Sequence, residues 1–294
     1  MDKKSDERRR AEFDAGMQHV LGNLNGHIRD EADELDRIAT GRGNVDFCVS
    51  LRGAHFFAAA LVSWFRDRDL LAFKQACYAA AKVDRIRQQA SPWFIGQDLV
   101  GNLFGAWYWL TSDCEPLIAW RRDTEPFRGW TGDQPRPKWL SQSFYNDVFV
   151  GYQLTLALRG EWQRLGERTE RWLADPPVSL KKIVPDMRFF LALAKGDVPG
   201  MEAMLREIVT PKQRLWRRNW QDGYSRRLIS DEAVTYAKLA WRHGYQVDVD
   251  TPYIPKEWLP IAPLPEYTDP YDFMRGFDIW QPLPAAGNRT APAA

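Results

Sequence analysis

The chain has 294 residues, of which 45% are hydrophobic and 27% charged, and its formal net charge is +1. This balance is typical of a globular protein that is long enough for one large core or two modest ones. Nucleic-acid binding needs a strongly basic stripe, which a near-neutral chain does not offer, so we expect no nucleic-acid partner.

Three features bear on where the protein is found. The N-terminal stretch MDKKSDERRRAEFD has no apolar core and does not resemble a secretory signal. The longest apolar runs, such as Phe56–Phe65, are shorter than a membrane span. Cys48, Cys77 and Cys114 are too widely spaced to indicate a disulfide framework or a metal site. We therefore expect a cytoplasmic protein without a membrane partner.

Apolar residues recur at helical spacing through the first part of the chain. They predict helices over about 5–40, 45–68 and 70–88, another that begins at Ser91-Pro92, and a short one over Asp113–Arg122. Asn25-Gly26 is a candidate interruption of the first. The segment 45–68 is apolar nearly all round, so it is expected to lie at the centre of the fold.

The second part begins with a predicted loop, Thr124–Lys138 (TEPFRGWTGDQPRPK), which is rich in proline and glycine. Helix is expected again over about 140–175, with a break near Gly160 or Gly166. Further helices are expected over about 185–195 and 198–209, and the Gly-Asp turn between them is typical of an αα-hairpin. No repeat recurs at a fixed period, so a regular solenoid is not supported.

The stretch from Ser230 to Leu259 starts as a helix and ends as an extended segment. Ser230 is a capping residue, two acids occupy the first turn, and Gly244 can end the helix in a left-handed conformation. Val247 and Val249 then alternate with aspartates, and two prolines stiffen the remainder of the segment. We interpret Tyr245–Leu259 as a strap that packs against the helices.

Together these patterns predict a single all-α domain over 1–280. It is an irregular array of antiparallel helices, paired as αα-hairpins and closed by the extended C-terminal strap. The last stretch, 281–294 (QPLPAAGNRTAPAA), has little to bury and is expected to be a disordered tail.

The sequence shows no catalytic constellation. It has no glycine-rich phosphate loop and no Gly-x-Ser-x-Gly elbow, and its cysteines and histidines form no recognisable nucleophile arrangement. His27 and Glu31 have the spacing of a helix-bundle metal site, but no second Glu-x-x-His accompanies them. We therefore predict no catalytic residue, no cofactor and no metal ligand, and we do not expect an enzyme.

A family resemblance lies in the C-terminal pattern. The capped helix, the run A-x-x-A-W-x-x-G-Y-x-V-D-V-D and the closing P-Y-I-P-K-E-W-L resemble the signature of the immunity protein 49 family of bacterial polymorphic toxin systems. The likeness is clearest over about 225–260, and upstream it is one of helical character only. It implies an all-α cytoplasmic protein that protects a cell from a cognate toxin, and it brings no catalytic residues with it.

Three functions are compatible with these observations. The leading hypothesis is an immunity protein that neutralises a toxin by direct tight binding, occluding its active site without turnover. The partner is then a toxin encoded nearby, and a small-molecule ligand is not expected. The second is a helical scaffold that binds peptides or partner proteins. The third is a metal-dependent all-α enzyme.

Two surfaces are candidates for binding a partner. The first is the loop that presents Phe127, Arg128 and Trp130, because tryptophan and arginine are frequent interface anchors. The alternative is that Phe127 and Trp130 pack onto their own helices. The second is the acidic run Asp30–Asp36, which would suit a basic toxin and is otherwise a solvated helix face. Its candidate residues are Asp30, Glu31, Asp33 and Glu34.

Overall fold

The structure is a computed structural model of the chain, and it describes residues 3–90, 106–124, 142–217 and 223–282. Every regular element in these ranges is a helix, which confirms the predicted all-α class. In chain order they are α1 (Lys3–Thr40), α2 (Val45–Phe65), α3 (Leu70–Ala90), α5 (Ala106–Thr111), α6 (Glu115–Asp123), α7 (Gln142–Arg159), α8 (Trp162–Ala174), α9 (Val184–Lys195), α10 (Val198–Ile208), α11 (Pro211–Arg217) and α12 (Asp231–Arg242), with short 3₁₀ helices at Val178–Ile183 and Lys256–Trp258.

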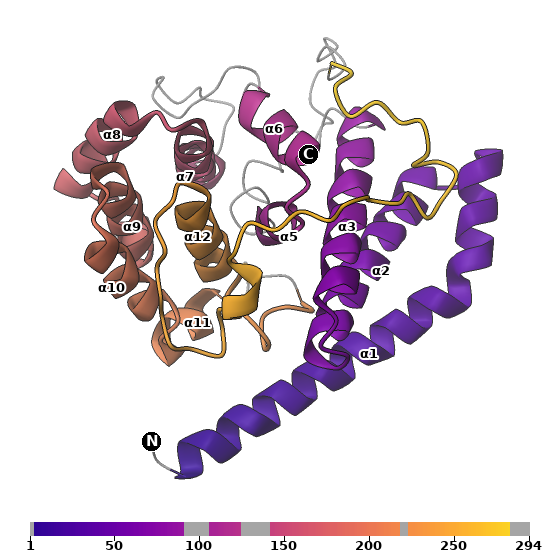
Figure 1. Cartoon of the computed structure of the whole chain (residues 1–294), viewed down its shortest axis with the longest axis horizontal. Coiled ribbons are helices and arrows are strands. Elements are labelled where there is room, and N and C mark those ends of the chain that lie inside the picture. The colour runs from indigo at the N-terminus through magenta and orange to yellow at the C-terminus, as the bar shows by residue number, and fades with distance from the viewer. Residues whose placement is uncertain (1–2, 91–105, 125–141, 218–222, 283–294) are drawn as a thin grey trace.

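The first three helices form one side of the molecule (Figure 1). α2 packs against both α1 and α3, as its all-round apolar sequence predicts, and Ala58, Ala60 and Leu61 are fully buried. The side chain of Asn44 caps α2 by accepting a hydrogen bond from the amide of Phe47 at 3.0 Å. α1 runs without a break through Asn25-Gly26, so the interruption considered there does not occur.

α2 also bears on the expectation about membranes. Although its uninterrupted apolar runs are short, the whole helix is long and apolar enough to cross a membrane by length and composition alone, the one such helix within the described ranges. The core helix of a globular fold passes the same test, and here α2 is largely covered by its two neighbours.

The other side of the molecule is built from paired helices, α8 with α9 and α9 with α10 (Figure 1). Gly160 has a φ of 70° between α7 and α8, which places the predicted break at this glycine rather than at Gly166. At the end of α9, Gly196 is left-handed, and Asp197 then caps α10 by accepting from the amide of Gly200 at 3.0 Å. The predicted αα-hairpin is thus confirmed.

α12 lies between the two sides, in contact with α5 and α10. Ser230 precedes it, but its hydroxyl makes no capping bond to the helix backbone, contrary to the sequence pattern. Asp231 and Glu232 are fully buried rather than exposed at the helix start. Arg217 on α11 lies 3.6 Å from Glu232, so this acid forms a tertiary ion pair. Gly244 has the predicted left-handed conformation.

The strap segment follows α12 and packs against the helices, but it is not extended throughout, because residues 252–253 form a turn and Lys256–Trp258 a 3₁₀ helix. Val247 and Val249 are buried and alternate with two exposed aspartates, as the sequence pattern predicts. Trp258 is fully buried, and its ring stacks on Phe73 of α3 with centroids 4.1 Å apart. Beyond the predicted end at Leu259, the chain continues across α3 to residue 282 without regular structure (Figure 1).

Polar contacts also fix this C-terminal segment. Lys238 of α12 donates to the carbonyl oxygens of Trp258, Leu259 and Pro260 at 2.9, 3.2 and 2.9 Å. Further along, Arg85 of α3 donates to the carbonyls of Ile279 and Gln281. The contact with Gln281 shows that the predicted tail is anchored at its first residue. Its remaining part from 283, like the helix expected after Ser91, lies outside the described residues.

Candidate partner-binding site

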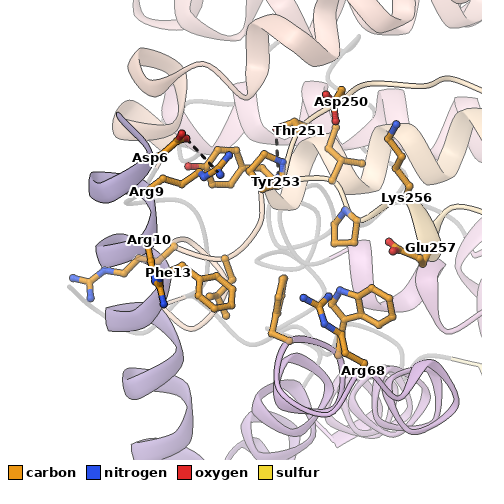
Figure 2. A pocket seen from close by; sticks show the side chains of 17 residues that line it. Asp6, Arg9, Arg10, Phe13, Arg68, Asp250, Thr251, Tyr253, Lys256 and Glu257 are labelled. Carbon is orange, nitrogen blue, oxygen red and sulfur yellow. Dashed lines mark hydrogen bonds and ion pairs between the residues drawn. The ribbon is translucent and has the colours of Figure 1, made fainter. Parts of the chain in front are cut away.

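A cleft of about 830 Å³ opens where α1, the end of α2 and the strap meet (Figure 2). One wall is the N-terminal part of α1 from Asp6 to Phe13, and the opposite wall is the strap from Asp250 to Glu257. Arg68, just after α2, and Arg227, just before α12, complete it. Segments distant in the sequence therefore build the site together.

Aromatic side chains line the base of the cleft. The rings of Phe13 and Phe65 meet edge to face with centroids 5.6 Å apart. Phe65 and Trp64 in turn contact the ring of Trp258, at 6.0 and 6.1 Å. Because Trp258 is fully buried, these contacts tie the base of the cleft to the protein core.

The strap wall is held in place from α1. Arg214 of α11 lies over the ring of Tyr253 at 3.4 Å from its centroid, and its guanidinium pairs with Glu12 of α1 at 3.1 Å. The carbonyl of Tyr253 accepts from the amide of Ser230 at 3.0 Å. Burial raises the pKa of the Tyr253 phenol, so this side chain stays neutral near physiological pH. Both the position and the charge of this wall are thereby fixed.

The cleft carries more positive than negative side chains. Five cationic and three anionic residues line it. Arg9 pairs with Asp6 at 3.6 Å, and Lys256 pairs with Asp248 at 2.7 Å. The guanidinium groups of the other three, which are Arg10, Arg68 and Arg227, are exposed and form no ion pair or hydrogen bond with any residue that the structure describes.

Local backbone features place two of these arginines. Arg68 has a φ of 56°, a left-handed conformation that is uncommon for a residue with a side chain, and its guanidinium lies 5.4 Å from the centre of the Trp64 ring. Arg227 lies against Gly16 of α1, where an added Cβ would come within 2.9 Å of the Arg227 Cβ. The missing side chain at Gly16 thus lets the loop before α12 approach α1.

The acidic residues predicted on α1 fall into two groups. Asp30 pairs with Arg29 at 2.9 Å and Asp33 with Arg37 at 2.8 Å, both near the surface. Glu31 lies 3.4 Å from Arg52 of α2, and Glu34 also pairs with this arginine. Glu34 is only 6% exposed, and burial raises the pKa of its carboxyl group. Each carboxylate already has an arginine partner, which weakens its attraction for a basic partner protein.

The other residues that the sequence analysis considered are those of the predicted loop and His27. Phe127, Arg128 and Trp130 lie outside the described residues. His27 does not combine with Glu31; its Nε2 is 3.0 Å from the hydroxyl of Tyr224, which joins α1 to the segment before α12. Across the part of the chain that the structure describes, no three histidine, cysteine, aspartate or glutamate side chains gather as metal ligands would. That either predicted surface contacts a partner stays a prediction.

The sequence interpretation missed the cleft arginines. Arg10, Arg68 and Arg227 belong to three separate segments, and no local spacing relates them. The one available signal was the strap itself, because the residues Thr251–Glu257 that carry the family resemblance form one wall of the cleft.

Comparison with known proteins finds one family match, which covers part of the chain. Residues 151–258 match the sequence model of the immunity protein 49 family. The resemblance found around residues 225–260 is confirmed and extends upstream to α7. No curated protein and no solved structure matches the chain. The immunity protein 49 match includes Arg227 and the strap wall of the cleft, whereas α1 and α2 lie before it.

Proposed function

We propose that this protein is an immunity protein that neutralises a cognate bacterial toxin by direct, tight and non-catalytic binding in the cytoplasm. The observation that carries the proposal is the immunity protein 49 match over residues 151–258. A cleft lined by arginine and aromatic residues also supports it, because these residue types dominate the binding energy of protein interfaces. The three cysteines are free and buried, which suits a reducing compartment.

Binding is proposed to occlude the active site of the toxin. An inhibitor of this kind acts stoichiometrically, since each toxin molecule must be covered by one immunity molecule. The alternative of an enzyme that inactivates the toxin predicts protection at far lower ratios. A general peptide-binding scaffold predicts instead that unrelated proteins are bound as well as the toxin.

The test begins with the open reading frames beside the gene. A neighbour that encodes a toxin domain is expressed under an inducible promoter, with and without this chain. We expect growth only when the chain is present, and a complex of the two purified proteins by size-exclusion chromatography. Titration of toxin activity should end at an equimolar ratio. Protection without a complex, or protection far below the equimolar ratio, would contradict the binding mechanism.

A further inference from the structure

Most surface arginines that form an ion pair in the described part of the chain do so with a carboxylate a few residues away in the sequence. Arg29 pairs with Asp30, Arg66 with Asp67 and Arg122 with Asp123. The three cleft arginines differ, although an unpaired arginine on a surface is ordinary by itself. What is unusual is that Arg10, Arg68 and Arg227 converge on one cleft from three segments.

Arg68 shows this difference most clearly. It directly follows the Arg66–Asp67 pair, yet its own guanidinium stays in the cleft beside Trp64. Its left-handed backbone costs roughly 1 kcal/mol relative to glycine. Strained residues of this kind gather at binding sites, where the surrounding structure holds them in place. The strain is explained if the arginine side chain is needed at this point.

The charges of the cleft define the chemistry of its occupant. Arginine binds carboxylates through two parallel hydrogen bonds, so exposed arginines beside aromatic rings suit acidic groups next to apolar ones. The strap wall contains Pro252 and Pro255, with a turn at 252–253 and a 3₁₀ helix that begins at Lys256. Asp250 and Glu257, on the strap side opposite Arg10 in Figure 2, disfavour a uniformly acidic ligand and make the strap side more negative than the α1 side.

The end of the chain itself does not have this chemistry. Residues 283–294 contain one arginine and no aspartate or glutamate, so they cannot supply a carboxylate side chain to the cleft. The acidic run of α1 in a second copy is also a poor match, because its carboxylates already pair with arginines of their own chain.

We infer that the cleft is the docking surface for an acidic segment of the partner protein, anchored by Arg10, Arg68 and Arg227. This inference rests on the proposed function for the identity of the partner, which is the toxin. It assigns the toxin a surface segment in which carboxylates alternate with apolar side chains. The segment binds between α1 and the strap, with its carboxylates on the arginines.

The first experiment uses the full chain and a fluorescein-labelled peptide that alternates glutamate with leucine. Binding is measured by fluorescence anisotropy and compared with the same peptide carrying glutamine in place of glutamate. We expect the acidic peptide to bind about tenfold more tightly or better, and added salt to weaken it. Equal affinity for the two peptides would overturn the inference.

The chain offers matched control variants. Arg10→Glu, Arg68→Glu and Arg227→Glu reverse charges inside the cleft. Arg8→Glu and Arg226→Glu make the same change at exposed positions outside it, on the segments of Arg10 and Arg227. Each cleft variant should weaken peptide binding by about tenfold, and the controls should stay within about twofold. Equal losses in both sets would show a general charge effect and overturn the inference. Thermal melting checks that every variant is folded.

The second experiment separates the cleft from the proposed function. Wild type and the variants are tested for protection against the toxin and for complex formation. If wild type protects and the cleft variants protect equally well, the cleft is the wrong surface while the proposed function stands. If wild type fails to protect, the proposed function fails. The peptide experiment alone then tests whether the cleft binds an acidic segment. A concentration-dependent dimer that Arg68→Glu abolishes would overturn the inference in favour of a second copy.

Discussion

Lys238 and Asp113 form a fully buried ion pair, with Nζ and Oδ1 2.7 Å apart. Lys74 reaches the same carboxylate at 2.7 Å, so two ammonium groups share one aspartate in the core. Carbonyl oxygens of the strap and of the residues just after it compensate: those of Trp258, Leu259 and Pro260 accept from Lys238, and that of Ala262 accepts from Lys74. Burial still lowers the pKa of Lys238, to about 8. One carboxylate therefore links α3, α12 and the strap.

The first prediction concerns this carboxylate. Asp113→Asn keeps the shape of the side chain and tolerates the left-handed φ of 56° at this position. It leaves two buried ammonium groups without a counter-ion, which should lower the free energy of unfolding by about 3–5 kcal/mol. Asp123→Asn breaks an exposed pair with Arg122 and should change it by less than about 1 kcal/mol. Urea unfolding compares the two, and equal effects would contradict this role of Asp113.

The second prediction concerns the strap. Truncation after Gly244 removes the buried side chains of Val247, Ile254 and Trp258 from their contacts with the helices. It should cost several kcal/mol, at roughly 25 cal/mol for each Å² of apolar surface uncovered. Truncation after Pro282 keeps the contacts of Arg85 and Gln89 and should leave the melting temperature nearly unchanged. The strap is not needed for folding if both truncated chains melt like the full protein.

The third prediction uses the partly buried His55, which touches Phe56 and lies near Arg52, Glu31 and His27. Burial lowers its pKa from 6.5 to about 4. The unfolded chain therefore binds more protons between these pH values, so this contribution to stability is present above pH 6.5 and is lost as the pH falls towards 4. Because the side chain is partly accessible to solvent, the loss should be on the order of 1–2 kcal/mol.

The variant His55→Gln removes this titration and should lose less stability than wild type over the same acid range. His19→Gln, at an exposed histidine of α1, serves as the control and should follow wild type. Urea unfolding at several pH values measures the difference. Parallel curves for wild type and His55→Gln would show that another group is responsible for the acid sensitivity.

The fourth prediction concerns Arg128 and Trp130 of the stretch that the sequence predicts to be a loop. If the loop contacts the toxin, Arg128→Ala and Trp130→Ala should each weaken binding by on the order of 2 kcal/mol and leave thermal stability nearly intact. If Trp130 packs on its own helices, Trp130→Ala should lower the melting temperature and leave affinity unchanged. Calorimetry with the toxin and thermal melting of the same samples distinguish the two outcomes.

Local patterns explain why much of the fold could be predicted. The apolar periodicity of α1, α2 and α3 and the Gly196–Asp197 turn are signals within single segments, and tertiary packing agrees with them. The strap was predictable because Val247 and Val249 alternate with aspartates. Two elements, the 3₁₀ helix at Val178–Ile183 and α11, have no apolar period long enough to reveal them.

Long-range pairing explains what could not be predicted. Asp113 was expected to start a helix, but α6 begins at Glu115, and Asp113 instead has a left-handed backbone that directs it to Lys74 and Lys238. Glu232 has the sequence context of an exposed helix start and lies buried near Arg217 for the same reason. The cleft depends entirely on such long-range assembly, so the sequence pointed only to its strap wall.

The last prediction separates strain from binding at Arg68. Glycine adopts a φ of 56° without steric cost, so Arg68→Gly should leave the protein as stable as wild type or up to about 1 kcal/mol more stable. The control is Arg66→Gly, two residues earlier, where φ is −94°. Glycine there adds freedom to the unfolded chain and removes the exposed pair with Asp67, which contributes little to stability. That variant should lose roughly 0.5–1 kcal/mol of stability.

Arg68→Gly should nevertheless weaken binding of the acidic peptide about tenfold, whereas Arg66→Gly should not. Stability that rises while binding falls would show that the strain at Arg68 is kept for its side chain. A loss of stability in Arg68→Gly as large as that in Arg66→Gly would instead show that the arginine packs structurally against Trp64.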